Sequence, residues 1–111
     1  MKKSKAKRKN FGAVRKPSGR VVIEGITPWH IDRLQFFLCL YSVGIYEKKE
    51  ATIADKSLAW VANELLEKKV ADTRRKTLPV KPHEMGVLVL AIALAKDIDL
   101  LNLKGQLHRL L

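Results

Sequence analysis

The stretch that decides the fold is TPWHIDRLQFFLCLYSVGIY, residues 27–46. Threonine followed by proline predicts a helix start, because the threonine side chain can accept a free backbone N–H and proline at the first helical position has none to leave unsatisfied. Apolar residues then recur at the spacing of one helical face. They are Leu34, Phe37, Leu38, Tyr41 and Ile45, with Phe36 and Leu40 widening the stripe. We therefore expect a core helix over residues 28–46.

Helical signals continue towards the C-terminus. Thr52, with Asp55 three residues later, resembles a capping box and predicts the start of a second helix. Pro82 can open a third helix through the apolar run that follows, ending or bending near Asp97. A last stripe consists of Leu100, Leu103, Leu107 and Leu110. Alternation typical of strands is almost absent, although residues 21–23 could form a short extended piece docked on the body. The pattern predicts an all-α fold, a small three- or four-helix bundle.

Positive charge is concentrated at the N-terminal end. The chain has 22 Lys and Arg against 11 Asp and Glu, and residues 1–20 hold nine of the basic residues and none of the acidic ones. Such a segment cannot bury enough apolar surface to offset the entropy lost on ordering. We therefore expect a flexible, disordered cationic arm over residues 1–20 and a helical domain over residues 21–111.

Self-association is expected from the third helix. The run over residues 86–95 is apolar around the full circumference of a helix, and so small a body has too few other helices to cover it on every side. A two-fold homo-oligomer would cover the remainder. Trp29 at a helix start is expected in the core, whereas Trp60 and Leu66 are the predicted partner interface, since tryptophan is enriched at binding hot spots.

Clustered Lys and Arg side chains are the candidate binding residues. Such groups contact phosphates and release the counterions condensed on a nucleic acid, without reading base sequence. A second basic cluster follows the expected second helix, where positive charge also complements the helix C-terminus. The predicted nucleic-acid-binding residues are Lys2, Lys3, Lys5, Lys7, Arg8, Lys9, Arg15, Lys16, Arg20, Lys69, Arg74, Arg75 and Lys76. A merely solubilising terminus would carry the same charge.

Two segments are similar to DNA-binding motifs. Residues 15–20, RKPSGR, resemble an AT-hook, although a serine stands where the first core arginine of that motif lies, and the proline and glycine favour a plain turn. Residues 57–76 resemble a winged-helix recognition helix, without the strand pair that would build the wing. That resemblance implies base or phosphate contacts by Lys56, Ser57 and Asn63.

No group of residues predicts enzymatic chemistry. Cys39 lies between leucines inside the first helix, a setting typical of a small buried hydrophobe. His30, His83 and His108 are isolated from one another, which disfavours a metal site. There is no Gly-rich phosphate loop of either common spacing. We expect a protein that is not an enzyme and has no cofactor, metal or small-molecule substrate.

The residues that follow the basic N-terminal segment indicate the cellular location of the protein. A signal peptide would need an apolar stretch there, but polar residues, glycine and proline follow instead. The apolar run of residues 86–95 is well short of the roughly 20 residues that span a bilayer. A single cysteine fits a reducing compartment. The prediction is a cytoplasmic protein, associated with a nucleoid or nucleoprotein assembly, with no membrane partner.

These observations favour a non-enzymatic nucleic-acid-binding accessory or regulatory protein. The arm would contact phosphates and the helical body would set geometry, with duplex DNA favoured over RNA because the arm has almost no aromatic side chains to stack on single-stranded bases. The alternative is a helical protein–protein adaptor whose basic arm serves targeting or an acidic partner.

Overall fold

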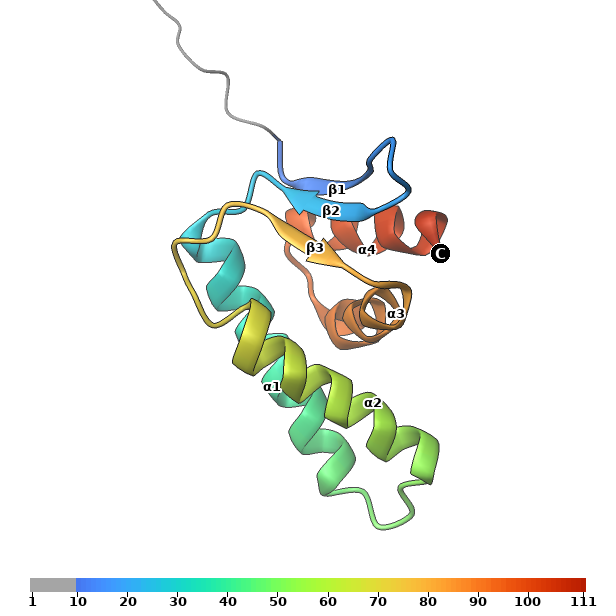
Figure 1. Cartoon of the computed structure of the whole chain (residues 1–111). Coiled ribbons are helices and arrows are strands. Elements are labelled where there is room, and N and C mark those ends of the chain that lie inside the picture. The colour runs from blue at the N-terminus through green and yellow to red at the C-terminus, as the bar shows by residue number, and fades with distance from the viewer. Residues whose placement is uncertain (1–9) are drawn as a thin grey trace, which may run out of the picture.

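The computed structural model describes residues 10–111, which form a mostly helical body with one small sheet (Figure 1). In chain order the elements are β1 (Gly12–Arg15), β2 (Val21–Glu24), α1 (Pro28–Tyr46), α2 (Ile53–Glu64), a π-helical turn η1 (Leu65–Lys69), β3 (Leu78–Val80), α3 (Pro82–Ala91), a 3₁₀ turn η2 (Ile92–Leu94) and α4 (Ile98–Leu110). The helices are confirmed, but the prediction of a purely all-α fold is wrong, because three short strands pair into a sheet.

The sheet is antiparallel throughout, with β2 between β1 and β3. Val21 pairs with Val80, and Ile23 pairs with Leu78. These four side chains are buried and face the helices, as the two-residue period of a strand requires. Strands of three or four residues are too short to show that period in the sequence. The pairing of β2 with β3 also joins segments separated by α1 and α2, so it leaves no local pattern in the sequence.

Residues 12–20 belong to the folded body, although the sequence places them in the arm. Lys16 N donates to Arg20 O at 2.7 Å, which closes the β1–β2 hairpin, and Gly19 adopts φ of 90° in the turn. The plain turn expected in residues 15–20 is thereby confirmed. On the other side of β1, the N–H of Ala13 donates to Gln106 Oε1 of α4 at 2.8 Å. Residues 1–9, the rest of the arm predicted for residues 1–20, lie outside the described residues.

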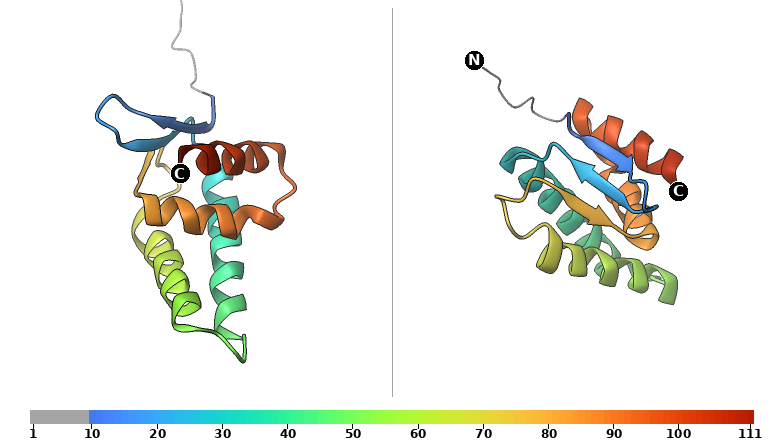
Figure 2. Two further views of the ribbon diagram at one scale, coloured as in Figure 1. Left: turned by 90° about the vertical axis from the view of Figure 1, so that its right-hand side faces the viewer. Right: turned by 45° about the horizontal axis from the view of Figure 1, so that its top comes forward.

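Helices α1 and α2 form a helical hairpin whose loop lies at the end farthest from the sheet (Figures 1 and 2). Both start signals are confirmed. The side chain of Thr27 accepts from His30 N at 3.4 Å, and Thr52 Oγ1 accepts from Asp55 N at 3.0 Å. Asp55 completes the capping box by accepting from Thr52 N at 3.1 Å. That backbone hydrogen bond is the main reason why the pKa of Asp55 lies below its usual value.

The third helix is shorter than predicted. It ends at Ala91, passes through η2, and the chain turns so that α4 runs beneath β1 (Figure 2). This turn lets Leu100, Leu103 and Leu107 bury completely against the sheet and the other helices, which confirms the last leucine stripe. A single straight helix from residue 82 to 97 would have left the inner face of the sheet uncovered.

Helix α1 is covered on one face only. Leu34 and Leu38 are fully buried, as predicted, but Phe36 and Leu40 are about half exposed, at 49% and 53%. Trp29 and Cys39 are exposed as well, against the expectation that both are buried. The reason is that α2 and α3 pack against the other side of α1, whereas among residues 10–111 no helix packs along its outer side, where Arg33 pairs with Asp97.

Candidate functional site

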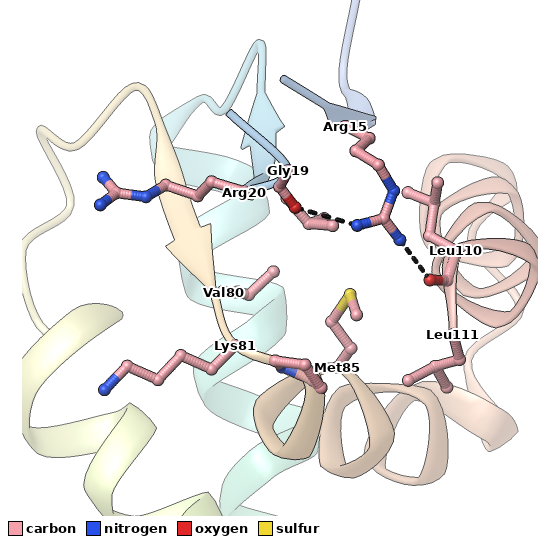
Figure 3. A pocket seen from close by; sticks show the side chains of 10 residues that line it. Arg15, Gly19, Arg20, Val80, Lys81, Met85, Leu110 and Leu111 are labelled. Atoms are coloured by element: carbon pink, nitrogen blue, oxygen red, sulfur yellow. Dashed lines mark hydrogen bonds between the residues drawn. The ribbon is translucent and has the colours of Figure 1, made fainter. Parts of the chain in front are cut away.

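The strand register brings basic side chains together at the hairpin end of the sheet. Arg20 lies one residue before Val21, and Lys81 lies one residue after Val80, so extending the Val21–Val80 pair by one step places these two residues opposite each other, just beyond the ends of β2 and β3. Figure 3 shows their side chains extending to the same side of the sheet. Like charges directly opposite in a sheet repel and are destabilising. Such a pair gains stability when an anion lies between its members.

Neither side chain of this pair is neutralised within the described chain. Among residues 10–111, no carboxylate pairs with Arg20 or Lys81, and both residues are exposed. They border a hollow of about 240 Å³, lined by Arg20, Lys69, Pro79, Val80 and Lys81. We call these three cations, Arg20, Lys69 and Lys81, the sheet-end cluster.

Lys69 is anchored at this hollow by two contacts. Its ammonium group donates to Pro79 O at 3.0 Å and to Glu84 Oε1 at 2.7 Å. Because Glu84 also accepts from Lys81 N at 2.9 Å, its carboxylate fixes the start of α3 against the end of η1. Lys69 is therefore positioned but partly neutralised, which leaves Arg20 and Lys81 as the two members of the cluster without a carboxylate partner among residues 10–111.

Arg15 and Arg20 both line a neighbouring hollow of about 300 Å³, and there the guanidinium group of Arg15 is engaged by backbone carbonyls. The guanidinium group of Arg15 donates to Gly19 O at 2.9 Å and to Leu110 O at 2.7 Å, so it ties the hairpin turn to the end of α4 (Figure 3). Apolar side chains, including that of Met85, line part of this hollow. Arg15 was predicted to bind phosphate, but in this structure its donors hold two backbone carbonyls together.

Three other predicted basic residues have partners within the described chain. Lys16 forms an ion pair with Glu24 across the hairpin. Arg74 pairs with Asp72 at 3.2 Å, and hydrogen bonds from the backbone and guanidinium of Arg74 hold the pKa of Asp72 below its usual value. Arg75 donates to Lys69 O at 3.1 Å, which keeps it beside the sheet-end cluster.

Several predicted residues lie elsewhere. Lys76 is exposed beyond α2, next to β3. Trp60 of the predicted partner interface is 65% exposed on α2, whereas Leu66 is half-buried and packs against the core. The side chains of six predicted phosphate ligands lie outside the described residues: Lys2, Lys3, Lys5, Lys7, Arg8 and Lys9.

The similarity to a winged helix does not extend to the structure. Among residues 10–111, one strand follows α2, and it pairs with β2 rather than with a second wing strand. Asn63, a candidate for base contact under that resemblance, instead accepts from Ser42 Oγ at 2.9 Å and donates to Tyr46 OH at 3.2 Å. It fastens α2 to α1 and is not directed outward.

Sequence reasoning missed Lys81 altogether. It lies between two prolines in what reads as a linker, and only the pairing of β3 with β2 places it opposite Arg20. The available signal was a lysine directly before a proline that opens a helix, where backbone N–H groups favour an anion. That signal by itself is weak, because many exposed lysines precede helices.

A buried histidine joins three parts of the fold. The N–H of Thr27 donates to His30 Nδ1 at 3.0 Å, so the ring proton lies on Nε2, which donates to Asp99 Oδ2 at 2.8 Å. The ring also stacks on Phe11, with centroids 3.7 Å apart. His30 thus connects the segment before β1, the start of α1 and the start of α4. Within the described residues, no group of His, Cys, Asp or Glu could hold a metal ion.

Replacing His30 by alanine is expected to lower the free energy of unfolding by about 2 kcal/mol or more. The change removes a stacked, buried ring, opens a cavity and leaves the partly buried Thr27 N–H without its acceptor. Urea unfolding of the variant measures the loss. His83→Ala and His108→Ala change exposed histidines and serve as controls, expected within about 0.5 kcal/mol of the wild type. Equal effects at all three positions would contradict the role given to His30.

Comparisons of the chain with known protein families, with curated proteins and with solved structures found no match. None of the helices formed by residues 10–111 is long and apolar enough to cross a membrane.

Proposed function

We propose that this chain is a non-enzymatic nucleic-acid-binding accessory or regulatory protein whose basic groups contact the phosphate backbone. The observation that carries the proposal is the opposed pair of Arg20 and Lys81, which have no carboxylate partner among residues 10–111 and border a hollow. A bound phosphate would relieve their mutual repulsion. Arg can bind two phosphate oxygens at once, and Lys supplies a point charge.

The N-terminal residues would add to this attraction. Residues 1–9 contain six Lys or Arg and no acidic residue. Each phosphate that such groups neutralise releases condensed counterions, so affinity would rise with the number of contacts and fall steeply with salt. Contacts of this kind fix the position of the protein on the backbone but carry no base information. The helical body would set the geometry and spacing of the contacts.

Duplex DNA is the favoured partner for a structural reason. Proteins that bind single strands stack bases on exposed aromatic rings. Phe11 is the only aromatic residue in the first twenty, and its ring is stacked on His30. This occupied ring leaves residues 10–20 without a free aromatic side chain beside their basic groups, which supports a duplex ligand there, whereas the exposed Trp29, Tyr46 and Trp60 lie elsewhere on the body. RNA is the second candidate ligand. The setting would be a nucleoprotein assembly or nucleoid in the cytoplasm.

Reversing both charges of the opposed pair is expected to weaken duplex binding by about 10- to 100-fold at low salt. The Arg20→Glu, Lys81→Glu variant should also reduce the salt slope of log K by about two, because two phosphate contacts are lost. Fluorescence anisotropy with labelled duplex DNA and with RNA of the same sequence, across a salt series, measures both quantities.

The matched control is Lys49→Glu, Lys56→Glu. It makes the same change in net charge at two exposed lysines of the helical hairpin, away from the sheet. We expect a markedly smaller loss of affinity for this variant. If the two double variants bind equally well, the sheet-end cluster is not a binding surface and only net charge matters.

One observation favours the alternative of a protein–protein adaptor. Ile53 and Trp60, seven residues apart on α2, lie on one helical face, and both are strongly exposed. An apolar helix from another protein could dock there. The binding assay separates the two functions, since an adaptor without nucleic-acid affinity would bind neither duplex DNA nor RNA even at low salt.

A further inference from the structure

The outer side of α1 carries an apolar stripe with the spacing of a coiled-coil seam. Positions 29, 33, 36, 40, 43 and 47 are separated alternately by four and three residues, which is the a/d pattern of a heptad repeat. Four of the six positions hold large apolar residues, namely Trp29, Phe36, Leu40 and Val43, and all four are exposed. In a monomer this pattern has no structural use, because the buried face of α1 lies on the opposite side.

The one cation within the stripe is neutralised locally. Arg33 pairs with Asp97 at 3.2 Å, and its guanidinium group lies 5.3 Å from the centre of the Phe36 ring. Asp97 is flanked by Leu94 and Ile98, which are 86% and 71% exposed. The apolar surface therefore continues from α1 onto η2 and the start of α4.

This surface is large enough for a specific contact between proteins. Its exposed side chains present on the order of 600 Å² of apolar area, against roughly 800 Å² per partner in a standard interface. Monomeric proteins rarely expose a contiguous apolar patch of more than a few hundred Å². We call this surface the α1 seam, defined by Trp29, Phe36, Leu40, Val43, Leu94 and Ile98.

We propose that the α1 seam binds the α1 seam of a second copy of this chain, with the two helices antiparallel about a two-fold axis. In antiparallel coiled coils, a positions face d positions. With the axis between Phe36 and Leu40, each Phe36 meets a Leu40, each Arg33 meets a Val43, and each Trp29 meets a Glu47 whose carboxylate can accept from the indole N–H. The stripe is thus complementary to itself in size.

Charge also favours a second copy at this place. The chain has a net charge of +11, of which residues 1–20 contribute nine positive charges, so two copies repel each other chiefly where these segments approach. Along α1 itself, the one cation of the α1 seam, Arg33, is held by Asp97, while Lys96, between Leu94 and Ile98 in the chain, is exposed. The α1 seam is therefore the surface on which two copies can approach closely, and the homo-oligomer expected from the sequence would form through α1 instead of α3.

Equilibrium sedimentation of the full chain over a concentration series tests the proposal. We expect a monomer–dimer equilibrium whose dissociation constant rises by at least 30-fold in Phe36→Glu and, separately, in Leu40→Glu. The control is Ile53→Glu, which places the same charge at an exposed apolar residue of α2 outside the seam and should leave the equilibrium unchanged. Far-UV circular dichroism checks that each variant is folded.

Cys39 offers an independent readout of orientation. It lies one residue from the proposed axis, on one flank of the seam, and it is exposed. A two-fold axis places both copies of such a residue on the same flank, so a short bis-maleimide should link the two cysteines efficiently. The comparison is a Cys39→Ser, Ser57→Cys variant, whose cysteine lies on α2 and should link poorly.

Three outcomes would overturn the proposal. The wild-type chain could remain monomeric up to millimolar concentration. It could form a dimer that Phe36→Glu and Leu40→Glu leave intact, in which case another surface is used. It could dimerise with linkage at Ser57→Cys but not at Cys39. None of these results depends on nucleic-acid binding, so the proposal can fail or hold separately from the proposed function.

Discussion

A chain that begins at Asn10 is expected to bind duplex DNA with a salt slope smaller by about five than that of the full chain. The reason is the loss of six Lys or Arg residues, each of which contributes about 0.9 to the slope of log K against log salt when it contacts a phosphate. Between 50 and 200 mM salt, the full chain should lose roughly three decades more affinity than the truncated one. Anisotropy titrations at several salt concentrations measure both slopes.

The start of the truncated chain matters for this experiment. A chain that begins at Val21 would lose β1, the hydrogen bond from Ala13 to Gln106, and the link from Arg15 to the end of α4. Any loss of binding would then be mixed with a loss of fold. Beginning at Asn10 retains these contacts and the stacking of Phe11 on His30.

A full-length variant with glutamine in place of the six basic residues is the matched control for chain length. It should bind as weakly as the truncated chain, because both lack the same charges. If the full chain, the truncated chain and the glutamine variant share one salt slope, residues 1–9 make no phosphate contacts. In that case the sheet-end cluster would be the only supported binding element.

Replacing Leu34 by alanine is expected to destabilise the protein by about 2–5 kcal/mol. Leu34 is fully buried on the inner face of α1, in the cluster that joins this helix to the rest of the core. The cost combines the lost transfer free energy of the side chain with that of the cavity left behind. For a domain of this size, the melting temperature should fall by at least about 10 °C.

The control for this change is Ile53→Ala, at an apolar residue that is 85% exposed. Its effect is expected to stay within about 0.5 kcal/mol, because exposed side chains away from caps and the core contribute little to stability. Thermal and urea unfolding, followed by circular dichroism, compare the two variants. A loss for Leu34→Ala no greater than that for Ile53→Ala would contradict the position of α1 in the core.

The helices could be predicted because their signals are local. Thr27 and Thr52 cap helix starts through bonds to residues three positions on, and leucines at helical spacing mark the buried face of α4. The same reasoning misplaced Phe36 and Leu40. Periodicity shows that a helix is apolar over a wide arc, but it cannot show on how many sides other elements will cover that arc.

The candidate site was only partly predictable. Arg20 was named from charge density, which is a property of composition. Its opposition to Lys81 depends on the register of β3 on β2, the pairing of Lys16 with Glu24 depends on the β1–β2 hairpin, and the engagement of Arg15 with Leu110 O depends on the packing of α4 against β1. Charge density treats these cations alike, whereas the structure divides them into free and engaged groups.

By itself, the sequence determined the helical regions, the capped starts of α1 and α2 and the strong imbalance of charge towards the N-terminus, because each depends on residues that are neighbours along the chain. Only the tertiary structure decided that residues 12–15, 21–24 and 78–80 form one sheet, that Lys81 stands opposite Arg20, and that the outer side of α1 is left open. The physical reason is that such short strands leave little pattern in the sequence, and that the pairing of β3 with β2 and the cover of α1 result from contacts between distant segments.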